Sequence, residues 1–183
     1  ASDVYKRQVL AAVDLGHGAD WVLRGQHELG ATSSLGLALL NRDDERLTNR
    51  VLVLTGATRK GFWGTDLSWA GSTVGERPTG STANLAVHYQ SPRWFASVTP
   101  NYTRPGFRDN LGFIPFTDFE GVTSNVAYST EWRRGALRSA SAGWYTEDSH
   151  HYNGVLFRQE RQIFFGLQSR RDYELDFNWT GGR

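Results

Sequence analysis

The sequence predicts an all-β fold, an antiparallel up-and-down meander of about eleven strands that forms part of a larger transmembrane β-barrel. Three observations favour this fold. Apolar and polar residues alternate with a period of two, and no window shows a convincing helical period. Most predicted strands approach the roughly nine to eleven residues that a tilted strand needs to cross a bilayer. Tight turns and long loops alternate along the chain, as they do in outer-membrane barrels.

Alternation defines the individual strands. The clearest case is 173–179, where rings and aliphatic side chains fall on one side and polar side chains on the other. Segment 83–89 repeats this pattern. In chain order, the predicted strands are 9–15, 20–29, 33–41, 50–59, 62–73, 81–90, 93–103, 119–131, 136–147, 154–168 and 172–180.

The connections divide by length into two groups. The predicted tight turns are 30–32, 60–61, 91–92, 134–135 and 169–171, and the predicted long loops are 42–49, 74–80, 104–118 and 148–153. In an antiparallel meander, strict alternation places all long loops at one end and all tight turns at the other. A Greek-key sandwich mixes the two lengths at both ends.

Aromatic residues gather near both kinds of connection. Phe62, Trp63, Trp94, Phe95, Trp132 and Tyr173 lie near tight turns, and Trp21, Trp69, Tyr102 and Tyr145 lie near long loops. Rings of this kind settle at the two membrane interfaces, which predicts two aromatic girdles. The alternative is that large β-formers simply populate strand ends.

The polar side chains of the strands are predicted to share one face of the sheet. If the sheet closes, this face lines the lumen; the alternative is a solvated face that serves only solubility. The candidates for lumen-facing residues are Arg24, Glu28, Asp66, Asn84, His88, Glu174 and Asp176.

The loop 104–118 is the longest predicted connection, and a loop of this length in a compact domain usually has a functional or packing reason. We expect Phe113, Ile114 and Phe116 to pack it against the barrel wall or into the lumen as a constriction, with Asp109 and Asp118 near the pore.

The segment 110–119 resembles the signature N-P-E-x-G-F-L-x-R-x-D-Y of a bacterial family, the domain of unknown function 5916. A second similar segment is 21–41. The resemblance implies an outer-membrane β-barrel that, in complete proteins, follows a domain similar to family-9 carbohydrate-binding modules. The motif residues in this chain are Asp109, Asn110, Gly112, Phe113, Pro115, Phe116, Asp118 and Phe119.

Residues 1–8 look like the translation of a transposase adapter used in sequencing libraries, so they are expected to be an artefact. Residues 9–183 are then expected to be a fragment of a single barrel domain with both ends missing. No linker, repeat or low-complexity tract divides this part.

Composition excludes several function classes. The formal net charge is +1 and no long basic run occurs, which argues against nucleic-acid binding. The acidic clusters 43–45 and 147–148 fall in predicted loops, whereas a glycosidase needs two carboxylates at a fixed separation. His150 and His151 are adjacent and lack enough further ligands for a metal site. The sequence therefore predicts neither an enzyme nor a cofactor.

Together these features predict a non-enzymatic channel or anchor in the outer membrane of a Gram-negative bacterium, linked to carbohydrate binding or uptake. The expected partners are outer-membrane lipid and glycans bound through a missing N-terminal domain. One alternative is a soluble ligand-binding β-barrel or sandwich, which would have an apolar interior and a polar exterior. A glycoside hydrolase is the third alternative.

Overall fold

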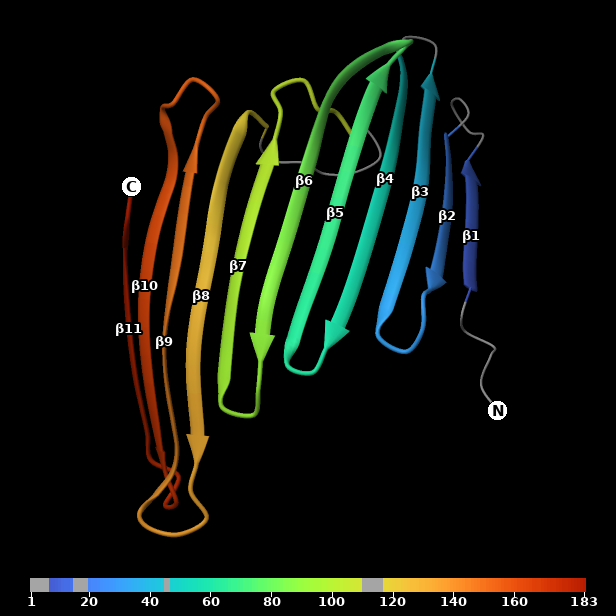
Figure 1. Cartoon of the computed structure of the whole chain (residues 1–183). Helices are drawn as coiled ribbons and strands as arrows, with labels where there is room; N and C mark the ends of the chain where they lie inside the picture. The colour runs from blue at the N-terminus through green and yellow to red at the C-terminus, as the bar shows by residue number, and fades with distance from the viewer. Residues whose placement is uncertain (1–6, 15–19, 45–46, 110–116) are drawn as a thin grey trace.

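The chain forms one antiparallel sheet whose eleven strands follow one another in sequence order, as the computed structural model in Figure 1 shows. The structure describes residues 7–14, 20–44, 47–109 and 117–183. Among these residues, no helix is long and apolar enough to cross a membrane. The prediction of an all-β meander is confirmed.

The strands agree with the predicted ranges to within a few residues at most ends, because alternation and turn residues mark them clearly. They are β1 (Arg7–Asp14), β2 (Asp20–Glu28), β3 (Ser33–Asp44), β4 (Leu47–Lys60), β5 (Trp63–Val74), β6 (Arg77–Gln90), β7 (Trp94–Thr103), β8 (Phe119–Glu131), β9 (Leu137–His150), β10 (Leu156–Ser169) and β11 (Glu174–Gly182).

The sheet is not closed into a barrel. In the described part of the chain, β1 pairs only with β2 and β11 only with β10. Figure 1 places these two strands at opposite sides of the sheet. Both outer strands therefore present an unpaired edge.

We call one end of the sheet the turn end; it carries the connections 29–32, 61–62, 91–93, 132–136 and 170–173. The other end, the loop end, carries the remaining connections. The longest described connection joins β7 to β8 at the loop end, as predicted.

The predicted strict alternation of short and long connections is wrong at two places on the loop end. Segment 74–80 contains only a two-residue gap, because β5 extends to Val74 and β6 begins at Arg77. A register shift after Ser72 accommodates Pro78 within the strand, although proline usually marks a turn. Segment 42–49 is likewise mostly paired strand, up to the pair Asp44 and Leu47.

The sheet has one apolar and one polar face, because paired residues share a face and neighbours along a strand alternate. All large hydrophobic side chains in the following set lie on the apolar face and are exposed: Leu23, Leu35, Leu37, Leu54, Leu67, Leu85, Val87, Val98, Val122, Trp144, Ile163, Phe165, Leu175, Phe177 and Trp179.

Side chains crowd together on the polar face and spread apart on the apolar face. On the polar face, a Cβ added to Gly143 would lie 2.3 Å from the ring of Phe164, and one added to Gly36 would lie 2.3 Å from Thr55. On the apolar face, a Cβ added to Gly25 meets nothing within 4 Å. The close atoms at Gly71 and Gly181 on this face belong to Trp69 and Trp179, two residues earlier on the same strand, and not to a neighbouring strand. This difference is the one expected of a sheet that curves with its polar face inside.

Burial agrees with this curvature. In the described part of the chain, seven strand side chains are buried; six of them lie on the polar face, and Asn41 is the exception. The six are Asn49, Val51, Ala70, Ser72, Thr103 and Ser149.

The pairing is staggered along the strands. Paired residues lead from Gly25 on β2, through Leu54 on β4 and Tyr102 on β7, to His150, the last residue of β9. A row of hydrogen-bonded residues thus starts inside one strand and leaves the sheet at the loop end several strands later.

Candidate functional site

The polar face and the loop folded onto it form the candidate functional site. All seven predicted polar residues project from this one face, in positions fixed by the strand register: Arg24, Glu28, Asp66, Asn84, His88, Glu174 and Asp176. That this face lines a lumen stays a prediction.

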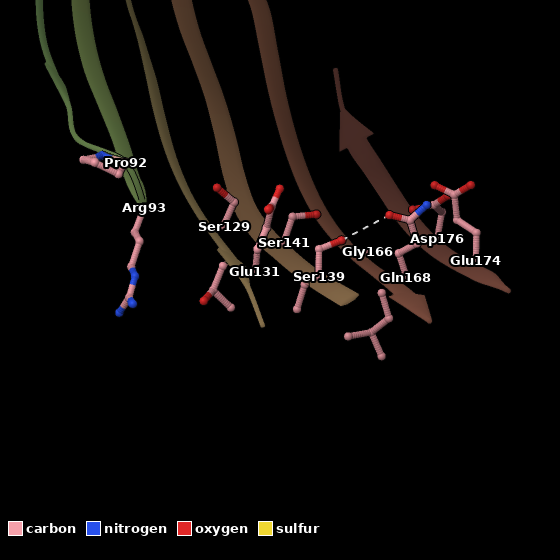
Figure 2. A pocket seen from close by; sticks show the side chains of 13 residues that line it. Pro92, Arg93, Ser129, Glu131, Ser139, Ser141, Gly166, Gln168, Glu174 and Asp176 are labelled. Carbon is pink, nitrogen blue, oxygen red and sulfur yellow. Dashed lines mark hydrogen bonds between the residues drawn. The ribbon is translucent and has the colours of Figure 1, made fainter. Parts of the chain in front are cut away.

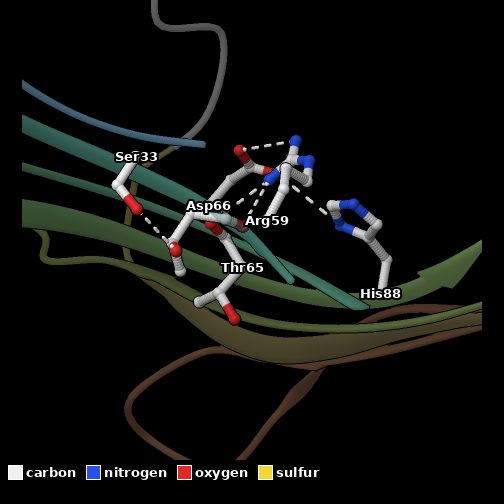
Figure 3. Close-up of polar contacts among 6 residues, drawn as sticks. Ser33, Arg59, Thr65, Asp66 and His88 are labelled. Atoms are coloured by element: carbon white, nitrogen blue, oxygen red, sulfur yellow. Dashed lines mark hydrogen bonds and ion pairs between the residues drawn. The ribbon is translucent and has the colours of Figure 1, made fainter. Parts of the chain in front are cut away.

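Asp66 is the centre of a charged cluster on the polar face (Figure 3). Its two carboxylate oxygens accept hydrogen bonds of 3.0 and 3.1 Å from Nη2 of Arg59. Nδ1 of His88 lies 3.5 Å from Asp66 Oδ2. A Cβ on Gly64 would lie 2.2 Å from the His88 ring. The ring can therefore occupy this position only because residue 64 has no side chain. The cluster joins three consecutive strands, β4 to β6.

The first part of the β7–β8 loop folds back over the polar face. Phe107 is only 3% exposed and belongs to a small apolar cluster with Val51 and Ala70. Leu40 and Val53 pack against the same cluster. A loop that leaves β7 therefore reaches side chains of β3, β4 and β5, on the inner side of the curve.

Hydrogen bonds hold the backbone of this loop in the same position. The amide of Arg108 donates to Ser72 Oγ at 3.0 Å, and Asn49 Nδ2 donates to the carbonyl of Arg108 at 3.2 Å. Gly80 is required by the close approach, since a Cβ there would lie 2.3 Å from the amide nitrogen of Phe107.

The C-terminal end of the β7–β8 loop, which we call its return, is attached to the opposite part of the sheet. Asp118 adopts a φ of 66°, and its carbonyl lies 2.6 Å from Nδ1 of His151. The ring of Phe119 stacks on Phe157 at 5.2 Å between centroids, and His151 meets the same ring edge-on. The two ends of the loop thus bind different strands across the polar face.

The predicted motif residues are only partly described. Asp109 is half-buried beside the anchored segment, and Asp118 and Phe119 form the return. The other motif residues lie outside the described residues: Asn110, Gly112, Phe113, Pro115 and Phe116. The same holds for Ile114. The anchor Phe107 was not predicted, because several apolar residues of the loop offered equivalent anchors in the sequence.

A polar hollow of about 490 Å³ lies at the turn end, between β8 and β11. Figure 2 shows Ser129, Ser139 and Ser141 along its wall, with Glu174 and Asp176 further along the same wall, beyond Gly166 and Gln168. Ser139 donates a hydrogen bond of 3.4 Å to Gln168. The hollow is therefore lined by hydroxyl and carboxylate groups, which suit polar solutes.

The carboxylates considered for glycosidase chemistry do not face each other. Glu147 lies on the polar face, where it accepts a hydrogen bond of 3.0 Å from Tyr145. Asp148 lies on the apolar face, where Nη2 of Arg161 donates to it at 2.6 Å. Within the described residues, no group of three His, Asp or Glu side chains could hold a metal ion.

Aromatic rings form two groups near the turn end, on the apolar side of the sheet. Tyr89 meets Phe62 and Trp63 edge-on at 5.8 and 5.2 Å, and Trp94 lies 4.8 Å from Tyr128. At the loop end, the predicted girdle is wrong for Tyr145. This residue is near a strand end but shares the polar face with Glu147, because strand parity rather than proximity to a loop decides the face.

Comparison with protein-family models, with characterised proteins and with solved structures gives no match. The resemblance described in the sequence analysis thus stays an expectation.

Proposed function

We propose that this chain is part of the wall of an outer-membrane β-barrel, with its apolar face toward lipid and its polar face toward the lumen. The barrel acts as a non-enzymatic channel or anchor. Ten of the eleven described strands, with nine to fourteen residues, reach the length of roughly nine residues that a crossing strand needs; only β1, with eight, falls short.

The direction of curvature is the observation that carries the proposal. A soluble β-barrel buries its apolar face on the inside of the curve, whereas a membrane barrel exposes that face to lipid on the outside. Here the crowded inner face carries Asp66, His88 and Asp176, and the open outer face carries exposed residues such as Leu37 and Phe177. A soluble ligand-binding barrel or sandwich is therefore the less suitable interpretation.

The β7–β8 loop supplies the constriction in this proposal. Phe107 and the hydrogen bonds of Ser72 and Asn49 hold it on the inner side of the curve, where it narrows the space beside the wall. The resemblance to barrels that follow carbohydrate-binding domains favours glycans as the partner of the complete protein. The hydroxyl- and carboxylate-lined hollow is compatible with the passage of such polar solutes.

Heat-modifiable gel migration tests the barrel. The complete protein that carries this chain is refolded in detergent and run with and without boiling. We expect a faster unboiled band and a strong β-type circular dichroism signal. Folding in plain buffer, with the same migration in both samples, would favour the soluble binding module instead.

Conductance tests the constriction. The substitution Ser72→Ala removes the acceptor of the Arg108 amide, and Phe107→Ala removes the apolar anchor. In planar bilayers, the double variant is expected to conduct more than the unmodified protein, because the loop leaves the inner face. Ser91→Ala, in a turn at the opposite end, is the control. Unchanged conductance in the double variant would rule out the constriction.

A further inference from the structure

Charge is distributed unequally between the two ends of the sheet. In the segments 28–33, 59–63, 90–94, 131–138 and 169–174 at the turn end, Arg and Lys outnumber Asp and Glu by eight to four. In the described residues of the loop-end segments 14–20, 42–49, 74–77, 103–120 and 147–158, they are outnumbered by ten to five. The turn end is thus the basic end of a chain that is almost neutral as a whole.

At the turn end, cations lie on both faces, and the polar-face cation Arg59 is paired with Asp66. The acids Glu28, Glu131 and Glu174 project from the polar face. Lys60, which pairs with Trp63, and Arg138, which neighbours the polar-face Ser139, project from the apolar face. Both cations are exposed, and neither forms an ion pair within the described residues.

Lys60 is paired directly with Trp63, and Arg138 lies on β9 four residues toward the turn end from Ala142, the partner of Tyr128. Trp63 is 59% exposed and Trp94 is 49% exposed, so both rings are available to a surrounding medium. Such rings settle at the headgroup level of a bilayer, and long cationic side chains nearby extend outward to the phosphates. Lys60 and Arg138 are placed where those phosphates lie.

Further cations lie at the same end, in two connections that hydrogen bonds join to each other. The amide of Arg170 donates to the carbonyl of Ala136 at 3.0 Å, and its guanidinium donates to the carbonyls of Gly135 and Trp132. These bonds hold the β8–β9 and β10–β11 connections side by side. The exposed residues Arg133, Arg134 and Arg171 belong to these two connections.

At the loop end of the apolar face, two acids have hydrogen-bond partners within the chain. Asp148 accepts hydrogen bonds from Arg161 at 2.6 Å and from Gln159 at 2.9 Å. Asp43 accepts one from Thr48 at 2.6 Å. At the turn-end rim, in contrast, Lys60 and Arg138 form no ion pair within the described residues.

From these observations, and on the basis of the proposed membrane barrel, we infer that the turn-end rim of the apolar face binds the anionic headgroups of phospholipids. Lys60 and Arg138 contact the headgroup phosphates, and the rings of Trp63 and Trp94 fix the depth of the contact. The chain would therefore prefer an anionic leaflet at its turn end.

Quenching of tryptophan fluorescence by brominated lipids tests this inference. The complete protein that carries this chain is reconstituted into phosphatidylcholine vesicles that contain brominated phosphatidylglycerol or, in parallel, brominated phosphatidylcholine. The unmodified protein is expected to favour phosphatidylglycerol. The double variant Lys60→Gln with Arg138→Gln should lose this preference by roughly fivefold per cation removed. The matched control, Arg77→Gln with Arg104→Gln, removes two exposed cations from the loop end and should retain it.

The outcomes separate the two proposals. An equal preference in both double variants, or no preference in the unmodified protein, would overturn the headgroup site; the latter result would direct attention to an acidic protein partner. Absence of quenching by either brominated lipid would mean that the protein is not in the bilayer, which would overturn the barrel and the headgroup site together. Selective loss in the turn-end variant supports the inference.

Discussion

Phe107 is the residue on which the position of the β7–β8 loop depends. It lies beyond the end of its own strand and contacts an apolar cluster built from strands that precede it by many residues. The sequence could not identify it, because the loop also contains Phe113, Ile114 and Phe116, and local pattern does not reveal which ring reaches Val51. The inward direction of the loop was nevertheless predicted from its length and turn residues.

The substitution Phe107→Ala is expected to destabilise the protein by about 3 kcal/mol, because it empties a buried apolar site. The denaturant midpoint of the refolded protein measures this loss. Trypsin should also cleave faster at Arg108 once the loop is released. Val155→Ala, at a side chain that is 57% exposed, should change stability by no more than about 0.5 kcal/mol. Equal effects in the two variants would show that Phe107 is not an anchor.

At the scale of the structural elements, the sequence predicted the strands most reliably. Alternation identified all eleven strands, because a period of two is repeated in each of them. It failed at Pro78 and Gly80, where turn-forming residues lie inside a strand beside a register shift. It also could not show which face is the inner one, because curvature is a property of the assembled sheet.

Glycine substitutions test the curvature of these strands. Gly143→Ala places a Cβ against Phe164 and the carbonyl of Val126, so it should destabilise the protein by about 1–3 kcal/mol. Gly25→Ala, on the open face, should be neutral or stabilising by less than about 1 kcal/mol. Denaturant unfolding of both variants measures the difference. A larger loss at Gly25 would contradict the assignment of the inner face.

At the scale of the whole molecule, the two unpaired edges and the exposed apolar face require partners. An open edge pairs readily with other chains, and a continuous apolar face of this size favours lipid or aggregation in water. In the proposed barrel, further strands cover the edges of β1 and β11, and lipid covers the apolar face.

A charge placed on the apolar face tests the contact with lipid. Leu37→Arg introduces a cation near the middle of this face and should lower folding stability in vesicles by about 2–4 kcal/mol. Gln26→Arg, on the polar face, is the control and should cost much less. Urea titration in lipid vesicles measures both values. Equal costs would indicate that neither face contacts hydrocarbon.

The staggered pairing between β2 and β9 has a geometric consequence. In a barrel wall, a stagger of this kind requires the strands to tilt relative to the barrel axis. The tilt is about 35–45° in closed barrels. A strand such as β5, with 12 residues, is roughly 40 Å long, and its projection on the barrel axis is then roughly 30 Å. This height exceeds the apolar band of about 25 Å in membrane barrels. Each tilted strand therefore extends a few ångströms beyond the apolar band, into the headgroup layer, at each membrane surface.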